Sequence, residues 1–187
     1  MKTKIPKLGM RTVKTALAVT VCLLLFLGLA ALGQALVTHG TGFVASVGAF
    51  LTMQEPLFAC VAAVICMQQT VAHSLHSGGG RLLGTAVGGA VGLGFMWISA
   101  HVWGGRLNIL FLLVGCMLVI WLMLLLDRRD ACAICAVTFI ILLVGANERE
   151  LPYLYALNRI LDTALGIAVS VAVNHVIRPV RGETNEQ

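Results

Sequence analysis

Long apolar runs separated by short polar segments dominate the pattern of this chain. About 20 predominantly apolar residues suffice for a helix to cross the hydrocarbon core of a bilayer. The pattern therefore predicts an all-α membrane protein with six transmembrane helices. They are expected over residues 11–37, 56–71, 81–103, 107–126, 131–146 and 152–177. Residues 43–53 form a further apolar piece, which we expect to be interfacial or partly inserted.

The first apolar run admits a second interpretation. The first apolar run follows a basic head and contains Ala-Leu-Gly-Gln-Ala near its end, as a cleaved signal peptide does. Its apolar part is longer than such a peptide requires, and this favours a retained helix.

The glycine triplet Gly78-Gly79-Gly80 predicts a break before the third helix, because consecutive glycines weaken helical structure.

Composition supports the membrane class and a single domain. The chain has 59% hydrophobic and 11% charged residues, whereas about a quarter of the residues in soluble domains are charged. We divide it into a basic cytoplasmic N-terminus (1–10), a six-helix transmembrane domain (11–177) and a polar cytoplasmic tail (178–187).

The distribution of charge predicts the orientation of the helices. With the N-terminus in the cytoplasm, ten of the 13 Lys and Arg residues fall in cytoplasmic segments and three fall outside. This asymmetry follows the positive-inside rule. Counting residues 43–53 as a full span would invert most of it. Six spans with both termini cytoplasmic is therefore the predicted topology.

The pattern Arg-x-x-x-Thr-Ala-x-Gly occurs twice, starting at Arg81 and at Arg159, each time in the first turns of an apolar run. A looser copy starts at Arg11. In the predicted topology the two full copies lie on antiparallel helices, at equivalent places in helices one to three and four to six. This predicts an inverted three-plus-three repeat, a plan that many transporters use with a site near the midplane.

The repeated arginines are candidates for holding an anion. A charge at the centre of a membrane helix costs roughly 2.5 to 3.5 kcal/mol, so it usually faces a partner or a water-filled cavity. On each helix the arginine shares a face with the residues three and four positions later. The candidate substrate-binding residues are Arg81, Arg159, Lys14, Thr85, Thr163, Asp162 and Asn158.

Structural roles for the same residues remain open. Arg81 begins its run and would reach the cytoplasmic headgroups by snorkelling. Arg159 would form a structural ion pair with Asp162 or Glu150, and Asn158 an interhelical hydrogen bond. The decisive question is whether the two arginines face one cavity or lipid on opposite sides. Gly84, Gly88 and Gly92 predict close helix contact, between the halves or between subunits.

Other function classes find little support. All six cysteines lie in apolar runs, which disfavours a disulfide framework. Cys132-x-x-Cys135 and the pair His73 and His76 lack neighbouring ligands, so a metal, redox or pH-sensing role is a minor alternative. No catalytic or nucleotide-binding constellation indicates an enzyme or a cofactor. No basic stripe with interleaved aromatics indicates nucleic acid.

Four segments together resemble the fusaric acid resistance / aromatic acid exporter superfamily. They are Met10–Ala18, Phe58–Thr70, the Arg81 copy and the stretch from Tyr155 through Thr163. The resemblance implies a multi-pass protein of the bacterial plasma (inner) membrane, forming a homodimer or higher homo-oligomer. Its implied activity is export of aromatic or other organic carboxylates. Residues 43–54 and Gln69, in place of an expected proline, depart from the family pattern.

The plant malate channels are related to the same superfamily and conduct anions through a pore lined by basic residues. By that analogy Arg81, Arg159 and Lys14 would form the positive lining. Transport of a small organic anion across the lipid bilayer is thus the first expectation. A passive anion channel and a non-transporting scaffold or accessory subunit are the alternatives.

Overall fold

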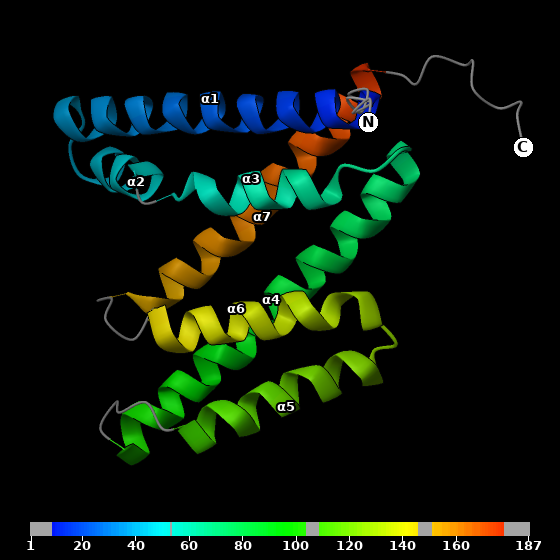
Figure 1. Ribbon diagram of the computed structural model, residues 1–187. Helices are drawn as coiled ribbons and strands as arrows, with labels where there is room; N and C mark the ends of the chain where they lie inside the picture. Colours follow the sequence, from blue (N-terminus) through cyan, green and yellow to red (C-terminus); the bar gives the residue numbers. More distant parts are fainter. Residues whose placement is uncertain (1–8, 53, 104–108, 146–150, 178–187) are drawn as a thin grey trace, which may run out of the picture.

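The computed structural model describes residues 9–52, 54–103, 109–145 and 151–177, and within them every regular element is a helix (Figure 1). The all-α prediction is confirmed. The elements are α1 (Met10–His39), α2 (Phe43–Thr52), α3 (Pro56–Cys66), α4 (Val71–Trp103), α5 (Ile109–Leu125), η1 (Arg129–Ala131), α6 (Cys132–Gly145) and α7 (Pro152–Val176). The predicted tail and most of the predicted N-terminal segment lie outside these ranges.

Three of these helices are long and apolar enough to cross a bilayer. They comprise Thr12–His39 of α1, Val71–Val102 of α4 and α7 over Pro152–Val176. Helices α2 and α3 meet at an angle of 57° and together could provide a fourth span. Helix α5 is apolar but has only 17 residues. Length and composition thus support three to four spans in the described residues, and the six-span topology stays a prediction.

The glycine triplet does not break the chain, so the predicted boundary at residue 81 is wrong. Helix α4 begins at Val71 and continues through Gly78, Gly79 and Gly80. A Cβ on Gly78 would lie 2.5 Å from the Ile167 side chain of α7, and one on Gly80 would lie 2.6 Å from Asp130 Oδ2. The glycines therefore permit close packing, which outweighs their low helix propensity.

Gly79→Ala gives a direct test of this account. A Cβ at Gly79 would meet no atom within 4 Å, and alanine favours a helix over glycine by about 0.8–1 kcal/mol. We expect the apparent melting temperature of the solubilised protein to rise or stay unchanged. Gly84→Ala, whose Cβ would lie 2.9 Å from the Ala131 backbone carbonyl oxygen, should lower it. A loss of stability in Gly79→Ala would contradict a continuous helix α4.

The predicted interfacial piece forms helix α2, which folds back along α1 (Figure 1). The turn between them uses Gly42, whose φ of 60° lies in the region that favours glycine. Gly33 and Gly48 lie at the contact, where a Cβ on Gly48 would be 2.7 Å from the Gly33 carbonyl oxygen. Helix α2 thus leads the chain back toward the start of α3.

The core of the described residues consists of three apolar clusters, and the two larger ones each combine helices from both halves of the chain. In Figure 1, α1 and α3 lie on one side, α5 and α6 on the other, and α4 and α7 run obliquely to them. The last helix, α7, completes the cluster of α1 and α3, and α4 completes the cluster of α5 and α6. The first cluster contains Ala18, Cys22, Phe26, Ala59, Ala63, Met67, Val169 and Val173. The second contains Val119, Met123, Ala131, Cys135, Phe139 and Leu143, with Val87, Val91 and Phe95 packed against it.

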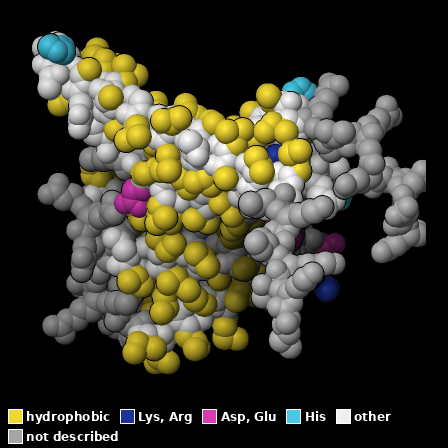
Figure 2. Space-filling model, turned by 45° about the horizontal axis from the view of Figure 1, so that its top comes forward, with side chains coloured by type: hydrophobic (Ala, Val, Ile, Leu, Met, Phe, Trp, Pro, Cys, Tyr) yellow, Lys and Arg dark blue, Asp and Glu magenta, His cyan; other side chains and the backbone are white. Residues whose placement is uncertain are grey.

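Apolar side chains also cover much of the outside. Figure 2 shows them across most of the face that it presents, with few charged groups among them. Helix α5 exposes a large apolar set: Ile109, Leu110, Leu113, Val114, Met117 and Trp121. A soluble protein rarely presents apolar patches of this extent. The surface and the helix lengths together indicate a multi-pass membrane protein.

Candidate functional site

The two repeated arginines line one cavity. It has a volume of about 160 Å³ and lies among α3, α4, α6 and α7. Both motif threonines line it as well. The full lining is Leu57, Phe58, Val61, Arg81, Thr85, Ile134, Val137, Thr138, Ile141, Arg159 and Thr163. The walls are therefore mostly apolar, with two guanidinium groups and three hydroxyls as the polar groups.

The glycine of each motif packs the helix that carries the arginine closely against a neighbouring helix. Gly88 and Gly166 each stand seven residues after their arginine (81 to 88 and 159 to 166). A Cβ on Gly88 would collide with the Cys135 carbonyl oxygen of α6, and one on Gly166 with the Ala59 carbonyl oxygen of α3. Close helix contact of this kind is the usual role of small residues in membrane helices. Gly88 therefore brings α4 onto α6 and Gly166 brings α7 onto α3, and each contact joins helices from opposite halves of the chain.

Arg159 is held chiefly by aromatic side chains. Its side chain is 5% exposed, and its guanidinium carbon lies 2.8 Å from the centre of the Phe58 ring and 4.9 Å from that of Tyr155. Arg159 Nη2 donates a hydrogen bond to Tyr155 Oη, while Nε has no hydrogen-bond partner in the described residues. A cation over an aromatic face is stabilised by the ring quadrupole. Within the described part of the chain Arg159 forms no ion pair with Asp162, and Glu150 lies outside that part.

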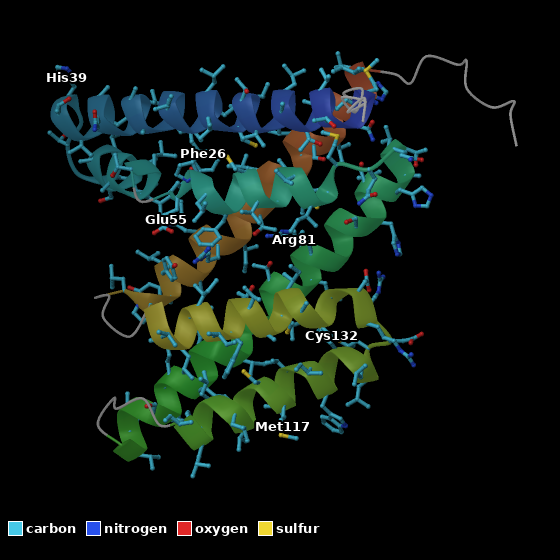
Figure 3. All side chains as sticks on the ribbon, viewed as in Figure 1. Phe26, His39, Glu55, Arg81, Met117 and Cys132 are labelled. Atoms are coloured by element: carbon cyan, nitrogen blue, oxygen red, sulfur yellow. The ribbon has the colours of Figure 1, made fainter. Side chains whose placement is uncertain are left out.

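Arg81 is the less satisfied of the two arginines. Figure 3 places it between α3 and α6. Its Nε and Nη1 atoms are buried and have no hydrogen-bond partner among the described residues. The Thr85 hydroxyl donates to the Arg81 carbonyl oxygen at 2.9 Å and is not a partner of either nitrogen. A buried charge without a partner is costly, and a carboxylate entering the cavity would supply the missing acceptors.

Lys14 lies apart from this cavity. Its Nζ donates to Asn174 Oδ1 at 3.0 Å, and Asn174 Nδ2 donates to the Gln68 carbonyl oxygen and to Ser74 Oγ, at 3.0 and 3.1 Å. This network fastens α1 to α7 and to the connection between α3 and α4. The structure thus brings Arg81 and Arg159 together but gives Lys14 structural contacts.

Asp162 and Asn158 also lie outside the cavity lining. Both are buried, with Asp162 1% and Asn158 4% exposed. Asp162 Oδ2 accepts a hydrogen bond from the Glu55 backbone N–H at 3.4 Å, where α3 begins. The carboxylate therefore contacts the start of α3 rather than the guanidinium.

Two aromatic contacts escaped the sequence analysis. Phe58 follows the helix-starting Pro56 by two residues, and Tyr155 precedes Arg159 by one helical turn. The spacing of Tyr155 from Arg159 gave a local signal, because residues four apart on a helix are neighbours. Phe58 gave none, since its contact with Arg159 joins two distant helices. All six cysteines are free thiols, and the described residues contain no metal-ligand cluster.

Fold and site together define a multi-pass membrane protein with a basic cavity between helices. Residues 41–173 match the family model described as fusaric acid resistance protein-like. The match covers more than half of the chain and includes both arginine motifs. The chain therefore belongs to the fusaric acid resistance protein-like family, and the predicted resemblance is confirmed. Neither the curated proteins nor the solved structures contain a match to it.

Proposed function

We propose that this protein exports aromatic or other organic carboxylates through the cavity between α4 and α7. The observation that carries the proposal is the meeting of Arg81 and Arg159 in one mostly apolar cavity. Guanidinium groups bind carboxylates through charge-assisted hydrogen bonds. The Phe58 ring and the aliphatic walls would accept the organic part of the substrate. Export and a place in the bacterial plasma membrane follow from the family resemblance.

The packing supports an inverted repeat with six spans. Helix α4 packs on α6 through Gly88, as α7 packs on α3 through Gly166. In Figure 1 the start of α1, the α3–α4 connection, the α5–α6 turn and the end of α7 lie at one end of the bundle. These are the segments assigned to the cytoplasm by their charge. A homodimer or higher oligomer, also proposed from the family, would cover part of the exposed apolar surface.

The short helices α3 and α6 further support a site between the repeats. They have 11 and 14 residues and correspond in the two halves. At 1.5 Å per residue they are about 16 and 21 Å long, less than the roughly 30 Å of the hydrocarbon core. Unusually short apolar segments at corresponding places in two halves are the best sequence pointer to a transporter binding site. Both helices line the cavity.

Reconstitution into liposomes tests the proposal. The protein should release labelled benzoate or salicylate faster than protein-free liposomes do, and unlabelled acid should compete. Flux no greater than in protein-free liposomes would overturn the proposal and favour a scaffold or accessory role. Anion currents that follow voltage alone would instead identify a passive channel.

Phe58→Leu should alter the choice among acids. Aromatic pairs contribute about 0.5–1.5 kcal/mol beyond burial, so we expect the preference for salicylate over an aliphatic carboxylate to fall about 2- to 10-fold. The ratio of the two fluxes removes any common loss through Arg159, which Phe58 also contacts. Ile141→Leu, on the α6 wall, is the matched control because it conserves volume. An unchanged ratio in Phe58→Leu would exclude ring recognition at this position.

A further inference from the structure

A second polar cluster lies beside the cavity, where α7 passes the beginning of α3. Three of its oxygens are buried and lack hydrogen-bond partners among the described residues: Gln54 Oε1, Asn158 Oδ1 and Asp162 Oδ1. Asp162 Oδ2 accepts the Glu55 backbone N–H and so ties this cluster to the start of α3. Figure 3 shows Glu55 at that end of the helix. Each unpaired oxygen can accept a hydrogen bond or coordinate a cation.

The positions of these residues on α7, and the contacts of the corresponding residues on α4, indicate that the three oxygens converge. Asn158 and Asp162 are one turn apart on the same face of α7. The corresponding residues of α4 are Gly80 and Gly84, just before and three after Arg81. Gly80 lies against the Asp130 side chain and Gly84 against the Ala131 carbonyl oxygen, both directly before α6.

The same correspondence between the two halves predicts that the α7 residues face the start of α3. Gln54 and Glu55 precede α3 as Asp130 and Ala131 precede α6. By this correspondence we infer that Asn158 lies opposite Gln54. The hydrogen bond from the Glu55 backbone N–H shows directly that Asp162 lies opposite Glu55. The two halves therefore differ at this point, because one has glycines where the other has side-chain oxygens. If these positions served only helix packing, glycine would suffice in both halves.

Groups of both charges surround Asp162, and its unpaired oxygen leaves room for a small cation. Arg159, one turn earlier on α7, is engaged by Tyr155 and Phe58. Glu55 adds a second negative charge from the α3 side, and the positive charge of Arg159 acts on Asp162 in the opposite sense. Lys14 of α1 is bound by Asn174 farther along α7, and Arg81 of α4 lines the cavity. A buried carboxylate in a membrane helix typically marks a proton or ion site, and a proton or Na⁺ would satisfy the unpaired oxygens.

We propose that Asp162, with Asn158 and Gln54, binds a small monovalent cation, a proton or Na⁺, that travels together with the carboxylate. The inference rests on the proposed function and names the cation that leaves with the substrate. Residues three apart on a helix are neighbours, so an ionised Asp162 opposes the binding of an anion at Arg159. Cation binding neutralises Asp162 and removes this repulsion. The cation and the monocarboxylate therefore bind cooperatively, and their joint transport is electroneutral.

Binding of salicylate to the purified protein tests the cooperativity without transport. Coupling between sites typically changes affinity about 5- to 150-fold, and we expect a change in this range on lowering the pH or adding Na⁺, with the ligand ionised throughout. Varying pH at fixed Na⁺, and Na⁺ at fixed pH, distinguishes the two cations. Asp162→Asn should bind salicylate with an affinity independent of both. Asp130→Asn, at the corresponding end of α6, should keep the wild-type dependence.

An affinity independent of both cations in the wild type, or the same dependence in Asp162→Asn, would overturn the cation site while leaving carboxylate export intact. If the wild type binds no salicylate and shows no flux, the proposed function fails. Infrared difference spectroscopy then examines the site alone. A carboxyl signal that responds to pH or Na⁺ in the wild type and is missing in Asp162→Asn supports the site. Identical spectra for the two proteins overturn it.

Discussion

Arg81→Gln is expected to lower carboxylate flux in liposomes about 10- to 100-fold, because a hydrogen bond to a charged group contributes about 1.5–3 kcal/mol. Two buried nitrogens of this guanidinium have no protein partner among the described residues, so the substrate would be their main acceptor. Glutamine keeps a polar side chain but removes the charge. Arg81→Lys should be intermediate, since an ammonium lacks the planar fork that binds a carboxylate at two points.

The matched control is Arg128→Gln. Arg128 is exposed at the α5–α6 turn and does not line the cavity, so wild-type flux is expected. Initial rates over a range of substrate concentrations separate weaker binding from slower turnover. Equal fluxes in Arg81→Gln and the wild type would favour the alternative that Arg81 serves only to reach the headgroups.

The second large effect is expected from a single methyl group at either motif glycine. In Gly88→Ala and Gly166→Ala the new Cβ meets a backbone carbonyl oxygen of α6 or α3, which cannot rotate away. Overpacking of this kind costs about 1–3 kcal/mol, and occasionally more. The apparent melting temperature of the solubilised protein should fall, and flux should fall with it because the helices that line the cavity move apart.

Gly94→Ala provides the control on the same helix as Gly88. A Cβ there would meet nothing within 4 Å, and the substitution removes the low helix propensity of glycine. Its stability should equal or exceed that of the wild type. Equal stability in Gly88→Ala and Gly94→Ala would show that α4 and α6 are not held as closely as described.

Much of the architecture was predictable because membrane helices follow from apolar length alone. Helices α1, α5, α6 and α7 lie close to their predicted ranges. The start of α4 was missed because its glycines are read locally as a break, whereas Gly78 and Gly80 serve contacts with α7 and Asp130. The end of α3 at Cys66 was likewise set by the chain's turn toward α4 rather than by apolar pattern.

The candidate site was predictable where the repeat specified it. Equal spacing in two motifs singled out Arg81, Arg159, Thr85 and Thr163, and all four line one cavity. The sequence left open whether the two arginines would share it. Lys14 was grouped with them through the looser third copy, but helix α1 belongs to the cluster on the other side of α3. Which helices become neighbours depends on tertiary packing, and a local motif does not contain that information.

Helix α7 completes the cluster of α1 and α3, and this has a consequence for biosynthesis. Ala18, Cys22 and Phe26 leave the ribosome early, yet their cluster is completed by Val169 and Val173 of the last helix. The N-terminal helices must therefore stay in the membrane with part of their inner face uncovered while the rest of the chain is made. The cluster whose first residues are made earliest therefore closes only when α7 inserts.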